Sequence, residues 1–107
     1  MDMREPTYLV LTSLADGPKH GYGVMRDVAG LSAGRVELRA GTLYAALDRL
    51  LNEGLVEASG EEVVEGRLRR YYALTDTGRE LLAAEAVRLQ ANAKVALTRL
   101  RVREARA

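Results

Sequence analysis

Apolar residues recur along the chain at the spacing of amphipathic helices, and breaks containing glycine separate the segments that carry them. A leucine-rich stretch predicts a first helix over residues 5–15. A second helix is predicted over residues 20–31, where Tyr22 and Val28 share one face. The third predicted helix covers residues 40–53 and has the clearest apolar stripe. That stripe consists of Leu43, Ala46, Leu47, Leu50 and Leu51.

The pattern changes after Gly54, where two short stretches that favour strands follow each other. Residues 55–59 and 68–74 predict the two strands of a hairpin, and the polar residues 60–67 predict a longish loop between them. The earlier segment 32–39 alternates apolar and charged residues. It predicts a loop that holds a very short strand.

A long helix is predicted from about residue 76 to about residue 103, because Thr75 is an apt N-cap and the stretch contains no Pro. Its leucines and alanines alternate in steps of four and three residues, which is the a/d seam of a coiled coil. The seam consists of Leu82, Ala86, Leu89, Ala93, Ala96 and Leu100, with Leu97 beside them. We expect this stripe to pair with a second copy; the alternative is a helix that folds back on its own domain.

The order of three helices, two strands and a long helix is that of a winged helix-turn-helix. We therefore expect a mainly α fold of the α+β type, with a three-helix core, a two-stranded β-wing and a long C-terminal dimerisation helix. On this basis the chain divides into a winged helix-turn-helix domain, residues 1–75, and a dimerisation helix, residues 76–107. In this motif the third helix enters the major groove of DNA.

The composition narrows the function classes. The 107 residues include no Cys and one His, which excludes disulfides, thiolate metal sites and a multi-His metal site within one chain. No nucleophile–base pair and no paired carboxylates stand out, so we expect neither an enzyme nor a cofactor. No apolar run approaches the roughly 20 residues that span a membrane, so a cytoplasmic protein without a membrane partner is expected.

The net charge is only +1, but the charges are unevenly distributed. Arg67, Arg69 and Arg70 cluster at the second predicted strand, while three glutamates occupy residues 60–67. Carboxylates at the tip of a wing would repel the phosphates of DNA. We therefore expect the arginines at the base of the wing, rather than its tip, to contact DNA.

Four stretches resemble, in order and at the expected separations, the sequences of PadR-family transcriptional regulators. They are Gly17-Pro18-Lys19-His20-Gly21-Tyr22-Gly23, Gly41-Thr42-Leu43-Tyr44-Ala45-Ala46-Leu47-Asp48-Arg49-Leu50, Glu53-Gly54-Leu55-Val56 and Arg69-Arg70-Tyr71-Tyr72-Ala73-Leu74-Thr75-Asp76-Thr77-Gly78-Arg79. The second resembles the recognition helix of the family, and the last resembles the second wing strand running into the dimer helix. The sequence departs from the family where Ala45 replaces the usual Pro and Gly23 stands where Glu is common.

The resemblance and the usual docking of the motif imply a set of DNA-contacting residues. They are Lys19, His20, Arg39, Thr42, Tyr44, Arg49, Arg67, Arg69 and Arg70. Alternatives stay open for most of them: Thr42 caps a helix, Tyr44 packs on the scaffold, and Arg49 pairs with a neighbouring carboxylate. In the alternative interpretation, Lys19 and His20 lie in a solvated loop. The alternative for the wing arginines is that they deter edge-to-edge aggregation of strands.

The resemblance also implies a function, that of a repressor which binds duplex DNA as a homodimer. Two recognition helices would then enter successive major grooves of a palindromic operator, about 34 Å apart. Related proteins bind flat aromatic effectors at the dimer centre; whether this chain has such a partner stays open, since it contains no Trp to stack a flat ligand. The main alternative is a winged helix that binds another protein and never touches DNA.

Overall fold

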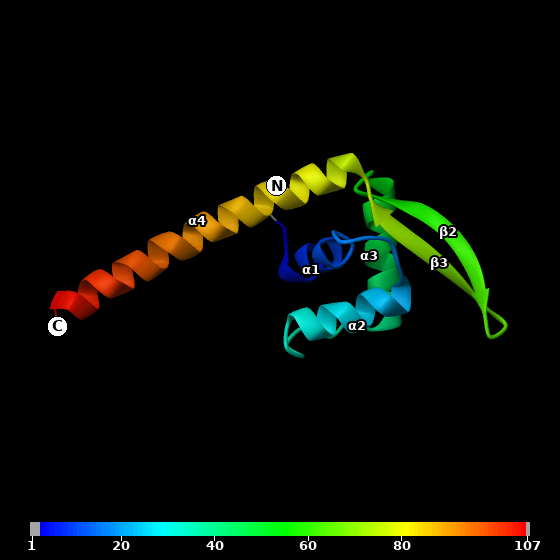
Figure 1. Ribbon diagram of the computed structural model, residues 1–107, viewed down its shortest axis with the longest axis horizontal. Coiled ribbons are helices and arrows are strands. Elements are labelled where there is room, and N and C mark those ends of the chain that lie inside the picture. Colours follow the sequence, from blue (N-terminus) through cyan, green and yellow to red (C-terminus); the bar gives the residue numbers. More distant parts are fainter. Residues whose placement is uncertain (1–2, 107) are drawn as a thin grey trace.

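The computed structural model describes residues 3–106; residues 1, 2 and 107, which fall within the predicted domain bounds, lie outside the described part. The elements in chain order are α1 (Glu5–Ser13), β1 (Lys19–His20), α2 (Gly21–Leu31), α3 (Ala40–Asn52), β2 (Val56–Val64), β3 (Arg67–Leu74) and α4 (Asp76–Arg106). Helices α1 to α3 pack together, the β2–β3 hairpin extends from one side, and α4 passes over α1 and projects far beyond it (Figure 1). The predicted winged helix-turn-helix fold is confirmed.

The core lies where the apolar faces of the three helices meet the base of the hairpin. Its buried members are Val10, Leu11, Leu14, Val24, Val28, Leu43, Leu47, Leu50, Leu55, Val56, Tyr72 and Leu74. Each fully buried aliphatic side chain contributes roughly 1.5–3 kcal/mol to folding. The apolar face predicted for the second helix was wrong in one member, because Tyr22 is 60% exposed and Val24 is buried beside Val28. Gly21 is buried beneath the Tyr44 ring, and Tyr22 beside it lies on the exposed side of α2.

The wing is part of a three-stranded antiparallel sheet with the strand order β1-β3-β2. The two-residue β1 pairs with Tyr71 and Tyr72 and had no signal in the sequence. The longish loop predicted over residues 60–67 was also wrong, since β2 and β3 continue to a two-residue turn at Glu65 and Gly66. Both turn residues have a left-handed backbone, with φ of 52° and 77°. This geometry suits the right-handed twist of a tight hairpin.

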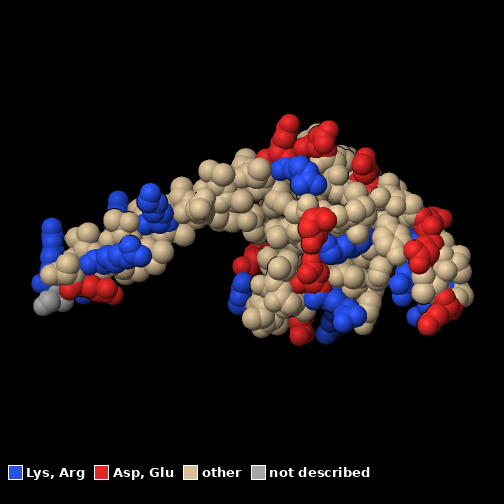
Figure 2. All heavy atoms as spheres, viewed as in Figure 1, with Lys and Arg blue, Asp and Glu red and all other residues tan. Residues whose placement is uncertain are grey.

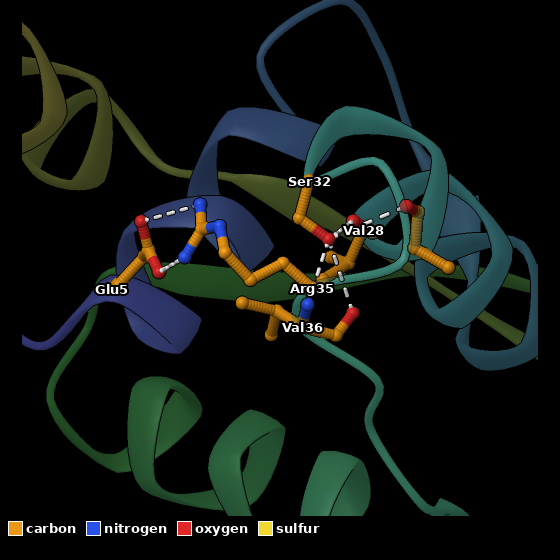
Figure 3. Close-up of polar contacts among 6 residues, drawn as sticks. Glu5, Val28, Ser32, Arg35 and Val36 are labelled. Atoms are coloured by element: carbon orange, nitrogen blue, oxygen red, sulfur yellow. Dashed lines mark hydrogen bonds and ion pairs between the residues drawn. The ribbon is translucent and has the colours of Figure 1, made fainter.

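The connection between α2 and α3 contains no strand at the position predicted within residues 32–39. Instead, the buried Ser32 hydroxyl donates to the Val28 carbonyl at 2.9 Å and accepts the Val36 amide at 3.0 Å (Figure 3). Arg35 reaches from the same connection to Glu5 at the start of α1, with one hydrogen bond of 2.9 Å (Figure 3). That hydrogen bond lowers the pKa of the Glu5 carboxyl. These contacts fix the connection that places α3.

Helix α4 begins against the winged domain and leaves it after about three turns. The Thr75 hydroxyl accepts the Gly78 amide at 3.0 Å, which confirms the predicted N-cap. Gly78 lies directly against the Leu55 carbonyl, and Leu81 and Leu82 pack against the core. Beyond Ala86 every described residue of the helix is exposed. No helix within residues 3–106 is long and apolar enough to cross a membrane.

Candidate nucleic-acid interface

A groove of about 760 Å³ lies between the wing and the starts of α2 and α3. We call it the wing groove. Its lining residues are His20, Tyr22, Tyr44, Val64, Glu65, Arg67, Leu68, Arg69 and Arg70. Five of the nine residues expected to contact DNA therefore meet around one hollow, although they come from three separate parts of the chain.

His20 occupies the start of α2 and is held from three sides. Its Nδ1 accepts the Gly23 amide at 3.2 Å, so His20 is the N-cap of α2. Its ring stacks parallel to Tyr22 with centroids 6.5 Å apart and meets the edge of Tyr71 at 5.6 Å. Because Nδ1 acts as an acceptor, the neutral ring carries its proton on Nε2. The structure thus gives His20 a capping role that the sequence did not predict.

Tyr44 connects the recognition helix to α2. Its phenol packs over Gly21, where a Cβ would clash with the ring, and yet the residue remains 44% exposed. The interpretation as scaffold packing therefore describes part of the side chain, and DNA contact by the exposed part stays a prediction. Tyr72, on β3, is buried, and its burial raises the pKa of its phenol. Tyr72 therefore stays neutral and serves the scaffold.

The wing carries its two kinds of charge on different strands. The arginines are on β3, the central strand, and Glu57, Glu61 and Glu62 are on β2, the outer strand. On the face drawn in Figure 2, Asp and Glu lie along the outer edge of the wing, while Lys and Arg lie on its side toward the helices. The basic side of the wing consequently borders the wing groove.

The remaining expected contacts lie outside the wing groove. Thr42 and Arg49 line a smaller groove of about 320 Å³ on the α1 side of α3, where Arg49 donates to the Thr7 hydroxyl at 2.9 Å. This contact with α1 was not among the interpretations of Arg49 drawn from the sequence. Arg39 is the exposed N-cap residue of α3, without a side-chain cap. All three residues lie on or beside the exposed surface of the recognition helix.

Lys19 is turned toward the body of the protein. Its ammonium donates to the Ser13 carbonyl and to Asp16, and Asp27 lies 3.9 Å away. The hydrogen bond from Lys19 lowers the pKa of the Asp16 carboxyl. Only 23% of the Lys19 side chain is exposed. A DNA contact by Lys19 requires these bonds to be exchanged for a phosphate.

Reasoning from sequence missed Tyr22 and Leu68 as groove residues. The apolar pattern predicts a buried position for Tyr22 and only a strand position for Leu68. The available signal was position, because Tyr22 follows His20 directly and Leu68 lies between two arginines. Arg26 lies over the Tyr22 ring at 5.8 Å and holds it at the rim of the groove.

The predicted dimer seam is divided by the structure into two parts. Leu82 and Ala86 are half-buried against their own domain. The remaining members of the seam are exposed: Leu89, Ala93, Ala96, Leu97 and Leu100. On the face drawn in Figure 2 the middle of α4 lacks charged side chains, and charged residues gather toward its end. An apolar surface therefore faces solvent over the projecting half of the helix.

Comparison with known proteins agrees with this geometry. The sequence profile of the Transcriptional regulator PadR-like family matches residues 10–84, which extend from the core of α1 into α4. The chain belongs to the PadR-like family of transcriptional regulators. The match includes α3, the whole wing and the part of α4 that packs on the winged domain, so all the elements that build the wing groove are PadR-like.

Two curated relatives are similar over most of this chain. A transcriptional regulator of Mycobacterium tuberculosis is 35% identical over 88 residues, which are 82% of this chain and 78% of the relative. An uncharacterised 37.1 kDa protein in transposon Tn4556 of Streptomyces fradiae is 43% identical over 86 residues. These residues are 80% of this chain but 23% of the transposon protein, so the PadR-like chain spans about a quarter of that relative's length.

Solved structures share the PadR-like fold. A PadR-like transcriptional regulator from Bacillus cereus superimposes with a TM-score of 0.73 at 22% identity, covering 89% of this chain and 90% of its own. Bacillus subtilis PadR, solved in complex with operator DNA, has a TM-score of 0.70 at 22% identity. The superposition covers 80% of this chain and 49% of that PadR chain.

Proposed function

We propose that this protein binds duplex DNA sequence-specifically as a homodimer and represses transcription from the bound site. The observation that carries the proposal is the wing groove, which is lined by Arg67, Arg69 and Arg70 of the wing together with His20 and Tyr44. The relation to PadR, which was solved with operator DNA, supports the same conclusion.

The roles follow from chemistry and position. Guanidinium groups on the wing suit phosphate oxygens, since they offer several donors and a permanent charge. The Nε2–H of His20 is a further donor to phosphate at the same groove, and the phenol of Tyr44, which lies on α3, is a donor for base edges. Sequence would be read by the exposed surface of α3, where Thr42 and Arg49 offer a hydroxyl, a methyl group and a guanidinium to base edges. The wing thus supplies affinity, and α3 supplies sequence preference.

The dimer is proposed on the exposed seam of α4, residues 89–100. A helix of 31 residues is about 46 Å long, and its second half has no neighbours in one chain. Isolated helices are marginally stable in water, because most helical stability in proteins comes from packing of an apolar face. Pairing of two seams would remove this surface from water. A two-fold dimer would then read a palindromic operator and block transcription by occupying it.

Fluorescence anisotropy with a labelled duplex from the region upstream of the protein's own gene tests the proposal. Arg70→Ala should weaken binding to all duplexes and lower the slope of log affinity against log salt by about one, since one phosphate contact is lost. Tyr44→Ala should relax the preference for the cognate sequence, by about 1–3 kcal/mol of discrimination.

Arg103→Ala is the matched control, because it removes the same charge at the exposed far end of α4. It should leave both affinity and sequence preference close to those of the unmodified protein. If Arg70→Ala and Arg103→Ala have the same DNA affinity and salt slope, the proposal that the wing contacts DNA is wrong. Absence of salt-dependent binding to any duplex would favour a winged helix that binds another protein.

A further inference from the structure

The register of the wing places carboxylates opposite its arginines. From Val56 to Ala58, β2 pairs with β3 in one register, and the register then shifts between Ala58 and Glu61. Two residues of β2 face a single residue of β3 there, which is a β-bulge, and Gly60 within it has φ of 98°. Beyond the bulge, Glu61 lies opposite Arg70 and Glu62 lies opposite Arg69.

These carboxylates already have partners on β3. Arg70 Nε is 3.5 Å from Glu61 Oε1, and the Tyr71 hydroxyl donates to Glu62 Oε2 at 3.3 Å. The Arg70 and Glu61 side chains remain 68% and 57% exposed, so water screens the pair and another anion can displace it. Glu61 therefore competes with a DNA phosphate for Arg70, whereas Glu62 is held by Tyr71.

The surroundings of β3 indicate on which side the Arg70 guanidinium is held. β1 pairs with β3 only as far as Tyr71, so the segment of β3 from Arg67 to Arg70 borders the wing groove with no strand beside it. β2 lies on the opposite side of β3. Arg70 and Glu61 both line a second hollow of about 310 Å³, and Glu61 does not line the wing groove. The ion pair therefore draws the Arg70 guanidinium away from the groove in which a phosphate would receive it.

We infer that Glu61, by pairing with Arg70, limits the affinity of the wing for the phosphates of DNA of any sequence. This inference rests on the proposed function. Phosphate contacts supply essentially all of the affinity for unrelated DNA, whereas the cognate site adds contacts of α3 to base edges. A carboxylate that weakens a phosphate contact made on every duplex lowers both affinities by a similar factor, and it therefore limits how tightly the protein is retained on unrelated DNA.

The test measures binding of a labelled duplex of unrelated sequence over a range of salt concentrations. Glu61→Gln should bind about two- to fivefold more tightly than the unmodified protein, the range for release of an exposed ion pair. Its salt slope should steepen by about one, since Arg70 gains a phosphate. Glu62→Gln removes a carboxylate whose partner is Tyr71 and should raise affinity less than Glu61→Gln. Glu57→Gln is the matched control: it loses the same charge on the same strand but lies opposite Ala73.

A double-mutant cycle separates the specific pairing from a general change in charge. The gain from Glu61→Gln should disappear in the Arg70→Gln background, whereas any gain from Glu57→Gln should persist. If Glu61→Gln behaves like Glu57→Gln, or weakens binding, the inference is wrong while the proposed function stands. If the unmodified protein binds no duplex at low salt, the proposed function fails and the inference fails with it.

Discussion

Ser32 is a single residue on which the placement of the recognition helix depends. Its hydroxyl is buried, donates to a carbonyl of α2 and accepts the Val36 amide from the connection that follows (Figure 3). Without this acceptor the Val36 amide would need another partner in a part-buried setting. An unmet buried donor costs the full desolvation of the group, which is more than the net worth of an ordinary hydrogen bond.

Ser32→Ala should therefore lower the free energy of unfolding by about 1–3 kcal/mol, because it leaves the Val36 amide unpaired. Denaturant unfolding followed by circular dichroism measures the change. Ser59→Ala is the control, since Ser59 is exposed on the wing and should change stability little. Equal stability of both variants would show that water replaces the Ser32 hydroxyl without cost.

At the scale of elements, α4 is positioned by a close approach between Gly78, in its first turn, and the backbone of Leu55. A Cβ at this position would overlap the carbonyl of Leu55, which belongs to the turn after α3, so the backbone of one element would have to move. The Thr75 hydroxyl joins the same region by donating to the Gly54 carbonyl at 2.6 Å. The angle at which α4 leaves the winged domain is therefore fixed at its first turn.

Gly78→Ala should destabilise the protein by about 1–3 kcal/mol or more, since overpacking against backbone is poorly relieved. Gly30→Ala is the matched control, because Gly30 lies in α2 with nothing near its Cβ position. Alanine there should stabilise α2 by roughly 0.5–1 kcal/mol. Thermal unfolding of both variants tests the contrast, and a Gly78→Ala protein as stable as the original would contradict the close approach.

Hydrophobic periodicity predicted the elements that bury apolar residues. It failed for β1 and for the outer part of the wing, where pairing between strands decides the structure. Leu43, Leu47 and Leu50 were assigned correctly because their spacing alone defines the buried face of α3. The strand at Lys19 and His20 exists only because Tyr71 and Tyr72 offer it an edge. Glu61 and Glu62 appeared to belong to a loop, since strand propensity is low for carboxylates, although the turn at Glu65 and Gly66 extends the ladder past them.

For the candidate site, the sequence predicted which residues take part better than it predicted which residues they contact. The arginines of the wing and Tyr44 were expected at DNA, and they line one groove. His20 caps an amide only three residues away, but histidine is not among the preferred N-cap residues, so the local pattern did not predict the cap. The bond that turns Lys19 inward depends on where the Ser13 carbonyl, at the end of α1, lies in space. The bulge beside Gly60, which decides which glutamate faces which arginine, was likewise beyond local reasoning.

At the scale of the whole molecule, one chain is elongated, with extents of 64 × 28 × 21 Å, because α4 projects from the winged domain (Figure 1). Leu97 and Leu100 on the projecting part are 53% and 59% exposed. Val95 is exposed as well but lies more than 90° away from these leucines around the helix axis, as its spacing at about 100° per residue requires. The face with Leu97 and Leu100 is thus the expected dimer seam, and the face with Val95 lies outside it.

The variant Leu97→Glu/Leu100→Glu should dissociate the dimer at micromolar concentrations, since it places four carboxylates in the paired seam. Sedimentation velocity measures the oligomeric state directly. Val95→Glu makes the same chemical change on the opposite face and should leave the dimer intact. A monomeric unmodified protein, or a dimer that tolerates both leucine changes, would contradict pairing through this seam.

The most direct test of the account is a footprint of the protein on the DNA upstream of its own gene. A dimer that places two α3 helices in successive major grooves predicts two protected half-sites related by a palindrome, with centres about 34 Å or one helical turn apart. Protection should vanish together at both half-sites in Leu97→Glu/Leu100→Glu. Uniform protection without half-sites, or no protection at low salt, would contradict a dimeric, sequence-specific DNA-binding regulator.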